Sequence, residues 1–514
     1  MAAVLLYPVE TINRSFKDPI TEGKAGAATG RNCLTRLRKG FIMYDPKSSK
    51  AEEFISHDEV LETLQYAEKN KNNAALIDCI LEKAKLRKGL SHREAAVLLD
   101  CELEDKNKEL YALAEQIKKD FYGNRIVLFA PLYLSNYCIN GCVYCPYHLK
   151  NKHIARKKMT QDEIRREVIA LQDMGHKRLA IEAGEDPVNN PLDYILECID
   201  TIYSIKHKNG AIRRVNVNIA ATTVEDYRKL KDAGIGTYIL FQETYHKESY
   251  EKLHPTGPKH NYAYHTEAMD RAMQGGIDDV GLGVLFGLEL YRYEFAALLM
   301  HAEHLEAAFG VGPHTISVPR IRRADDIDPS AFNNGIDDDT FAKIVACIRV
   351  SVPYTGMIVS TRESKECRER VLHLGVSQIS GASRTSVGGY CEPEPEDENS
   401  EQFEVSDKRT LDEVVRWLME LGYIPSFCTA CYREGRTGDR FMSLCKSGQI
   451  QNCCHPNALM TLKEYLEDYA AAGTKTVGEA LIQREIVNIP NEKVGRIARQ
   501  NLIDIANGSR DFRF

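Results

Sequence analysis

Short apolar or β-branched runs alternate with segments of helical period between residues 125 and 383. The runs lie at residues 125–134, 177–184, 213–221, 236–245, 278–287, 314–321, 356–363 and 377–383. The first helical segment opens on Thr160 and Glu163, which form a capping box, and later segments end on Gly234 and Gly275. Strands that alternate with helices form a parallel sheet, and eight such strands close a barrel. The sequence therefore predicts an α/β fold, a (β/α)8 TIM barrel over residues 125–383.

Two segments flank the predicted barrel. Residues 44–124 contain two S-x-x-E capping boxes before apolar-periodic stretches, which predicts a helical N-terminal lead-in. Residues 384–514 begin with an acidic, proline-containing loop and then carry a dense group of cysteines. We expect this second segment to be a C-terminal extension that binds a metal centre.

The N-terminal segment differs from the rest of the chain in composition and in hydrophobic pattern. Residues 1–43 are rich in Gly, Arg, Lys and Thr and show no helical or strand period before Met43. We expect residues 1–43 to be a disordered or non-native extension, with Met43 as the native start. An organellar presequence is the alternative for a eukaryotic source.

Composition restricts the class of protein. The 514 residues are 43% hydrophobic and 27% charged, a balance typical of soluble globular proteins. The net charge of −7 comes without any basic block, which argues against a nucleic-acid partner. No apolar run approaches the roughly 20 residues that span a bilayer, so no membrane association is expected. The fifteen cysteines are clustered rather than spread, which indicates metal sites in a reducing compartment such as the cytoplasm.

Three cysteines follow the first predicted strand at C-x3-C-x2-C spacing. They are Cys138, Cys142 and Cys145. In a (β/α)8 barrel this loop lies at the reactive, C-terminal mouth. Three thiolates hold three irons of a [4Fe–4S] cluster and leave the fourth iron open to a small molecule. A zinc site is the alternative, but zinc takes four ligands, usually in C-x2-C pairs, so the spacing fits it poorly.

This cysteine run, NYCINGCVYC, resembles the signature of radical S-adenosylmethionine (SAM) enzymes. The resemblance implies that SAM binds the open iron and that one electron cleaves it to a 5′-deoxyadenosyl radical. Tyr144 matches the aromatic position that packs on the SAM adenine. Gly184 and Glu185, at the end of the second predicted strand, resemble the Gly-Glu motif that receives the methionine ammonium group.

A second cysteine set lies in the C-terminal extension. Cys428, Cys431 and Cys454 give C-x2-C-x22-C, again with three evident ligands and room for an incompletely ligated iron–sulfur cluster. A structural zinc site is the alternative, with Cys428, Cys431 and Cys453 as ligands and either Cys454 or His455 as the fourth. Because Cys453 adjoins Cys454, the choice of Cys454 as third ligand stays open.

The two cysteine sets together with RLAIEAGEDPVN, GTYILFQETYHKESYEKLHP and TGMIVSTRES make the chain similar, from about residue 44 to its end, to the HydG family. These are radical SAM tyrosine lyases that mature [FeFe]-hydrogenase. The resemblance implies cleavage of L-tyrosine into p-cresol and dehydroglycine, and conversion of dehydroglycine into carbon monoxide and cyanide. It implies an Fe(CO)2(CN) product, bearing cysteine, for assembly of the hydrogenase H-cluster. It also implies an electron donor of the ferredoxin or flavodoxin type, and other hydrogenase maturases and the [FeFe]-hydrogenase as partners.

Two further residues take roles from this resemblance. His265 matches the histidine that holds an additional, cysteine-bound iron on the auxiliary cluster. Arg320, at the end of the sixth predicted strand, matches the position that binds the substrate carboxylate, and a guanidinium fork suits that task. We further expect a polar internal cavity that links the two ends of the barrel.

Two other functions remain open from the sequence. A ThiH-like tyrosine lyase (2-iminoacetate synthase) of thiamine thiazole synthesis has the same barrel motifs but lacks the second cluster. A non-catalytic iron–sulfur scaffold or carrier could also use this barrel. The cysteines at 428, 431 and 454 separate the first alternative from a hydrogenase maturase.

Overall fold

A computed structural model of the chain describes residues 43–391 and 400–514. The expectation for an N-terminal extension therefore falls, up to residue 42, outside the described residues. Part of the acidic loop that follows the barrel falls outside them as well.

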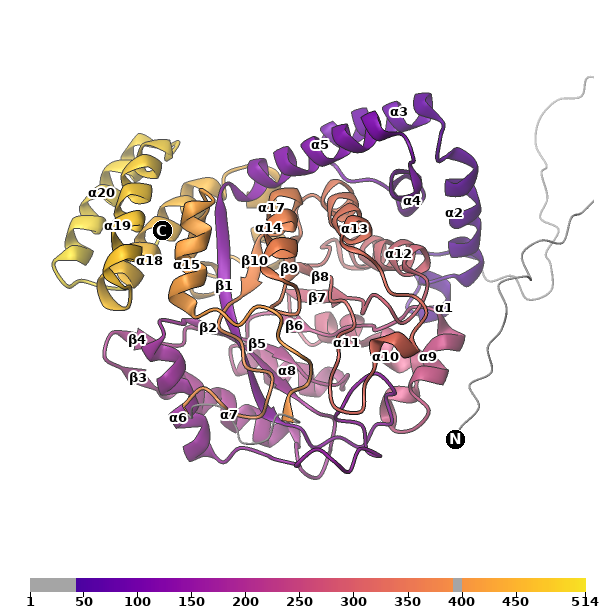
Figure 1. The fold of residues 1–514 in the computed structure, drawn as a ribbon, viewed down its shortest axis with the longest axis horizontal. Coiled ribbons are helices and arrows are strands. Elements are labelled where there is room, and N and C mark those ends of the chain that lie inside the picture. The colour runs from indigo at the N-terminus through magenta and orange to yellow at the C-terminus, as the bar shows by residue number, and fades with distance from the viewer. Residues whose placement is uncertain (1–42, 392–399) are drawn as a thin grey trace, which may run out of the picture. The chain divides into compact units, whose positions relative to one another are not determined.

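Eight parallel strands form a closed barrel (Figure 1). They are β1 (Arg125–Ser135), β2 (Arg178–Ala183), β5 (Arg214–Asn218), β6 (Tyr238–Ile239), β7 (Val280–Gly283), β8 (Thr315–Ser317), β9 (Gly356–Val359) and β10 (Gln378–Ser380). Neighbours along the chain pair in order, and β10 pairs with β1 through Leu128 and Ile379 to close the ring. The predicted (β/α)8 barrel is confirmed.

Regular pairing is shorter than the apolar runs suggested. The run at 236–245 forms a strand only over Tyr238–Ile239, because the chain beyond it turns away to build the loops of the barrel mouth. Polar loops after the strands are where reactive groups of such barrels lie. The shortened strands therefore leave long segments for the site.

Helices cover the outside of the barrel (Figure 1). They are α6 (Gln161–Asp173), α7 (Leu192–Ser204), α8 (Val224–Asp232), α9 (Lys247–Leu253), α10 (Tyr262–Thr266), α11 (Ala268–Gln274), α12 (Tyr291–Phe309), α13 (Asp338–Ser351) and α14 (Lys365–Leu374), and a short β3–β4 hairpin (Lys206–His207, Gly210–Ala211) follows α7. Thr160 and Glu163 form the predicted capping box of α6. After α11 the left-handed residue is Gly276, with φ +91°, rather than Gly275.

The predicted N-terminal lead-in is helical. It comprises α1 (Ala51–Phe54), α2 (His57–Asn70), α3 (Ala74–Lys85), α4 (His92–Asp100) and α5 (Glu104–Tyr122). Ser91 and Glu94 form a complete capping box on α4. The buried His92 imidazole lies 2.8 Å from Glu59 of α2 and 2.8 Å from Glu303 of α12, which ties the lead-in to the barrel wall.

The C-terminal extension adds a ninth strand to the sheet. It contains α15 (Leu411–Glu420), β11 (Ile424–Ser426), α16 (Ala430–Arg433), α17 (Gly438–Lys446), α18 (Gln451–Asp468), α19 (Ala472–Glu485) and α20 (Glu492–Ala506). Strand β11 pairs in parallel with the first residues of β1, from Arg125 opposite Ile424 to Val127 opposite Ser426. The cysteines after β11 are thereby brought to the N-terminal end of the barrel. Among the described residues, no helix has the length and apolar character needed to cross a membrane.

Candidate functional site

The loop of the first cysteine set is fixed by backbone hydrogen bonds to two neighbouring loops. The Ile139 amide donates to the Glu185 carbonyl (2.9 Å), and the Gly141 amide donates to the Thr256 carbonyl (2.9 Å). The Asn140 side chain donates to the Glu185 carboxylate (2.6 Å) and accepts from the Lys259 amide (3.0 Å). The loops after β1, β2 and β6 therefore hold the three thiols as one assembly.

Two glycines allow this close approach. A Cβ at Gly141 would lie 2.3 Å from Thr256 Oγ1, and one at Gly184 would lie 2.3 Å from the Tyr137 carbonyl oxygen. Gly184 therefore serves packing of the loop before Cys138. This role is independent of any contact that its backbone makes with a ligand.

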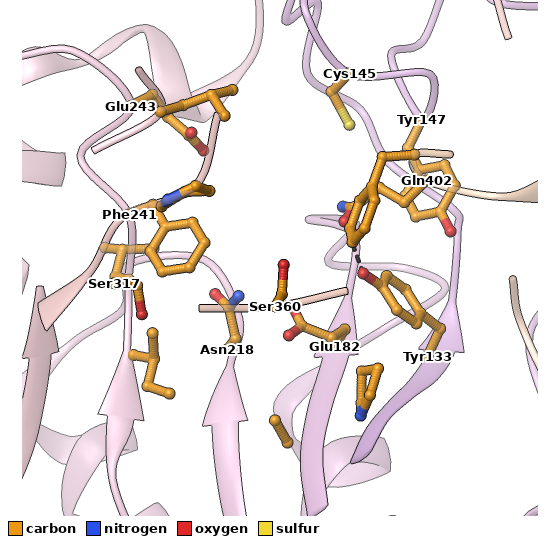
Figure 2. Close-up of a pocket in the computed structure, with 18 of the residues that line it drawn as sticks. Tyr133, Cys145, Tyr147, Glu182, Asn218, Phe241, Glu243, Ser317, Ser360 and Gln402 are labelled. Atoms are coloured by element: carbon orange, nitrogen blue, oxygen red, sulfur yellow. Dashed lines mark hydrogen bonds between the residues drawn. The ribbon is translucent and has the colours of Figure 1, made fainter. Parts of the chain in front are cut away.

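The three cysteines line a cavity of about 240 Å³ at the C-terminal mouth of the barrel. Tyr144, Gly184 and Glu185 line it as well, so the structure brings together the residues assigned to the first cluster and to SAM. Figure 2 shows Cys145 and Glu243 at the outer end of this cavity, and Glu182 and Asn218 further in, along the strands.

Tyr144 and Glu185 are both held by hydrogen bonds. The Tyr144 hydroxyl lies 2.7 Å from His254 Nε2, with the two rings edge to face. Burial lowers the pKa of His254 to about 2, so it is neutral and can accept this hydrogen bond. Burial raises the pKa of Glu185, and the hydrogen bond from Asn140 opposes that rise.

The first cysteine set fits a cubane cluster. Burial raises the pKa of the Cys145 thiol to about 12 and raises those of Cys138 and Cys142, so the metal-free thiols are neutral and cluster binding must displace their protons. Within the described part of the chain no set of three cysteine sulfurs lies close enough together to hold a single metal ion. That spread suits a cluster of several irons better than zinc.

His265 does not lie where the resemblance suggested. It lines the first cavity, and its Nε2 is 2.9 Å from the Phe241 carbonyl oxygen of the β6 loop. The second cysteine set lies at the other end of the barrel, so His265 cannot reach it. The reason is that α10, which carries His265, follows the C-terminal end of β6 and folds over the same mouth.

Arg320 does not face the cavity either. Its guanidinium is buried and binds Glu363 and Asp338, the latter at 2.7 Å, and it donates to the Ile336 carbonyl (3.1 Å). Two carboxylates and a carbonyl engage this guanidinium, so its charge is already neutralised by protein groups and it is not placed to bind a substrate carboxylate. This arrangement does not favour the predicted role of Arg320. Two other arginines, Arg322 and Arg362, do line the cavity.

The second cysteine set surrounds a smaller cavity of about 60 Å³. Cys428, Cys431 and Cys454 line it, together with Arg125, Arg178 and Arg214, which are the first residues of β1, β2 and β5. Residues that begin the strands lie at the N-terminal end of the barrel, opposite the first cysteine set. The two sites therefore occupy opposite ends.

Cys454 rather than Cys453 faces this second cavity. Cys453 lies outside the lining, with its sulfur 3.9 Å from Arg436 Nη1, and His455 Nε2 donates to the Glu485 carbonyl at 3.0 Å. Neither completes a four-ligand zinc site with Cys428 and Cys431. The geometry supports Cys454 as the third ligand.

Sequence reasoning missed His314, a buried histidine that lines the second cavity. Its Nδ1 lies 3.3 Å from Asp279. Burial raises the pKa of Asp279, but His314 and a hydrogen bond from Tyr432 outweigh it and hold that pKa well below its ordinary value. The sequence position of His314 could have indicated this location. His314 directly precedes β8 and therefore lies at the N-terminal end of the barrel, as Cys428 does.

The expected single cavity between the two ends is not what the structure shows. The two cavities share no lining residue, although residues two apart on one strand line different cavities: Arg178 and Ala180 on β2, and Gln378 and Ser380 on β10. On these two strands, the linings of the two cavities are therefore only two residues apart. Asn216 and Thr237 are buried polar members of the barrel interior.

Comparison with known proteins identifies the family. A crystal structure described as HydG, a maturase of the [FeFe]-hydrogenase, is 57% identical to this chain, with a TM-score of 0.87, and the match covers 90% of this chain and 100% of that one. The chain belongs to the HydG family. HydG from Carboxydothermus hydrogenoformans is 40% identical with a TM-score of 0.76, over 88% of this chain and 99% of that one.

Family models and a more distant relative agree with this membership. Residues 132–299 match the radical SAM superfamily, and residues 317–424 match the biotin and thiamin synthesis associated domain. The 2-iminoacetate synthase of Escherichia coli K12 is 30% identical over 62% of this chain and 81% of its own length. The HydG structures cover far more of the chain, including its C-terminal extension. The chain is therefore a radical SAM enzyme of the HydG type.

Proposed function

We propose that this HydG-family enzyme cleaves L-tyrosine between Cα and Cβ to p-cresol and dehydroglycine. It then converts dehydroglycine into carbon monoxide and cyanide and delivers an Fe(CO)2(CN) unit for assembly of the [FeFe]-hydrogenase H-cluster. SAM, L-tyrosine and free cysteine are its small-molecule partners, and a ferredoxin- or flavodoxin-type protein supplies electrons. Other maturases and the hydrogenase itself receive the product.

The observation that carries this proposal is the placement of two incomplete cysteine sites at opposite ends of one barrel. A simple lyase needs only the first. A [4Fe–4S] cluster on Cys138, Cys142 and Cys145 would supply the electron that cleaves SAM. The chain itself supplies a cavity beside that cluster, lined by apolar side chains and by polar ones that can orient an amino acid.

Arg362 is the residue that we assign to the substrate carboxylate, in place of Arg320. It lines the first cavity, and its guanidinium lies 3.4 Å from the centre of the Phe403 ring, which fixes its plane. Burial lowers its pKa, and the charges of Tyr133 and Glu243 oppose this. Among the residues that the structure describes, the Arg362 guanidinium donates no hydrogen bond to a carboxylate, so its planar fork is well suited to bind one bidentately.

At the other end, Cys428, Cys431 and Cys454 would hold the auxiliary cluster, and we assign the additional iron to His314 in place of His265. This supposes that the imidazole Nε2 is the ligand atom, since Nδ1 faces Asp279. A carboxylate that orients a metal-bound imidazole from its far side is a common arrangement. The auxiliary cluster would supply the iron on which carbon monoxide and cyanide are collected.

Anaerobic reconstitution with iron, sulfide and cysteine, followed by SAM, dithionite and tyrosine, tests the proposal. We expect p-cresol, 5′-deoxyadenosine, carbon monoxide captured by deoxymyoglobin, and infrared bands of iron-bound carbon monoxide and cyanide. Absence of p-cresol would overturn the lyase activity.

A second candidate is the reaction of 2-iminoacetate synthase, because the chain is 30% identical to that E. coli enzyme. The same assay separates the two functions. p-Cresol together with glyoxylate, but with neither carbon monoxide nor infrared bands, would favour this second candidate.

A further inference from the structure

A carboxylate stands on the wall of the first cavity with no role in the sites described so far. Glu182 lies on β2, where its register partners are Tyr133 of β1 and Asn218 of β5. Figure 2 shows its side chain between those two neighbours, further along the strands from the outer end that Cys145 marks. Tyr133 does not donate its hydroxyl hydrogen to Glu182, because that hydroxyl donates to the Gln402 side-chain oxygen at 2.8 Å.

Glu182 makes no ion pair among the residues that the structure describes. The charged or titratable groups that face it are Arg362 from the β9 loop, Glu243 from the β6 loop, Tyr133 from β1 and Tyr147 from the cysteine loop. Burial raises the pKa of Glu182 to about 8, and Arg362 and a hydrogen bond from Asn218 oppose the rise. A desolvated carboxylate without an ion-pair partner is costly to the fold. Buried carboxyl groups with strongly shifted pKa values are common at functional sites, where a bound ligand supplies the missing partner.

The reaction fixes which end of the substrate reaches Glu182. The radical arises beside Cys138, Cys142 and Cys145, and the bond to be broken is Cα–Cβ, so the amino-acid end of tyrosine must lie toward the cluster. Arg362, which also lines this cavity, then holds the carboxylate. The phenolic hydroxyl is the atom of tyrosine furthest from Cα, and it extends inward to where Figure 2 places Glu182 and Asn218.

We propose that Glu182 accepts the hydrogen bond of the substrate's phenolic hydroxyl, takes its proton during Cα–Cβ cleavage, and thereby selects tyrosine over phenylalanine. The inference rests on the proposed tyrosine lyase function. The proton moves from the phenolic oxygen to a Glu182 carboxylate oxygen, and the phenolate carries the negative charge that the carboxylate gives up. The cleavage leaves a radical on the benzylic carbon, which takes one electron from the ferredoxin- or flavodoxin-type donor and one proton from solvent. The same carboxyl then returns its proton to the phenolic oxygen and p-cresol leaves.

Two physical features suit Glu182 to this task. The pKa of a phenol is about 10, and the raised pKa of Glu182 is closer to that value than the pKa of an ordinary carboxyl group is. Proton transfer from the phenol to Glu182 is therefore less unfavourable. Phenylalanine would leave the buried carboxylate without the second donor that the phenolic hydroxyl supplies beside Asn218. A site built to hydrogen-bond a hydroxyl rejects the analogue that lacks it by a factor on the order of 10⁴.

The test compares Glu182→Gln with the wild-type enzyme, both reconstituted with their clusters. Glutamine keeps the shape and a hydrogen-bond acceptor but cannot take a proton. We expect kcat for p-cresol to fall at least about 100-fold. Reduction of the clusters and uncoupled cleavage of SAM to 5′-deoxyadenosine should stay unchanged. Glu197→Gln, at an exposed glutamate on α7, is the matched control and should behave as wild type.

A pH profile and substrate analogues complete the experiment. Because the ionised form acts as base, wild-type kcat/KM should rise as the pH increases through about 8, and Glu182→Gln should lose that rise. Ring-fluorinated tyrosines, whose phenols are more acidic, should partly restore kcat in Glu182→Gln.

Several results would overturn the proposal. One is a wild-type enzyme that forms p-cresol while Glu182→Gln matches it in kcat and pH profile. Another is a slow variant that fluorinated tyrosines do not restore, which would assign Glu182 to the substrate ammonium group. A wild-type enzyme that forms no p-cresol would refute the lyase function itself.

Discussion

At the scale of single residues, two arginines that follow neighbouring strands have different tasks. Arg320 follows β8 and is neutralised by Glu363 and Asp338, whereas Arg362 follows β9 and faces the cavity. Both are arginines at strand ends in a barrel whose strand ends carry the chemistry. The sequence does not separate the two arginines. The difference is that the fold gives Arg320 two carboxylate partners, which favours a structural role for Arg320 and leaves Arg362 for the proposed binding of substrate.

This difference gives a matched pair of substitutions. Arg362→Lys keeps the charge but loses the planar fork, so we expect KM for tyrosine to rise about 10-fold. Arg320→Lys should leave KM unchanged and instead lower the thermal unfolding midpoint, because Glu363 loses part of its pairing in a buried site. Steady-state p-cresol formation and calorimetry of the two variants measure both effects. A raised KM in Arg320→Lys alone would return the carboxylate role to Arg320.

Residue assignments were the least predictable part of the site. The three cysteines of each set were found from spacing, since ligand spacing is a local property of the chain. The roles predicted for His265 and Arg320 depend on the family resemblance. In the structure His265 contacts the Phe241 carbonyl at the C-terminal mouth, and Arg320 binds Glu363. His265 lies on α10, which follows the C-terminal end of β6, whereas His314 directly precedes β8 at the opposite end of the barrel, and only the fold shows this difference.

At the scale of elements, the helical lead-in is attached to the barrel through an ionisable contact. Burial disfavours the charged form of His92, but hydrogen bonds and charges of Glu303 and Glu59 outweigh it and raise the pKa of His92 to about 9. Folding then favours protonated His92. The stabilisation is fully present below the ordinary histidine pKa and is lost as the pH rises through 9.

We therefore expect a pH-dependent stability. Between about pH 6 and pH 9.5, the free energy of unfolding should fall by about 3 kcal/mol through this group. His92→Gln should flatten that part of the profile. Thermal unfolding at a series of pH values measures both. An identical slope in wild type and His92→Gln would contradict the assignment.

The C-terminal extension is tied to the barrel by a buried ion pair. Lys177, which directly precedes β2, binds Glu464 of α18, and both side chains are almost fully buried. Glu464 also accepts from the Asp511 amide at 2.6 Å. This pair fixes the helix that carries Cys454 against the end of the barrel that carries Arg178.

Breaking only one side of this pair should be costly. Lys177→Met leaves a buried carboxylate and should destabilise the protein by about 3–5 kcal/mol. The double variant Lys177→Met with Glu464→Leu removes both charges and should recover most of that loss. Thermal midpoints of the single and double variants form the test, and equal loss in both would argue against a buried-charge effect.

At the scale of the whole molecule, the barrel separates two chemistries. The proposed function assigns cleavage of tyrosine to the cavity at the C-terminal mouth and handling of the diatomic products to the cavity at the N-terminal end. The architecture was predictable because the alternation of apolar runs and helical segments repeats eight times. The position of the C-terminal extension was not predictable from the sequence. Its cysteines reach the N-terminal end of the barrel only because β11 pairs with the first residues of β1.

The most direct test of this division is the double variant Cys428→Ala with Cys431→Ala, assayed for p-cresol and for carbon monoxide in the same anaerobic reaction. The account predicts p-cresol at near the wild-type rate and no carbon monoxide. Loss of both products, or carbon monoxide at the wild-type level, would contradict it.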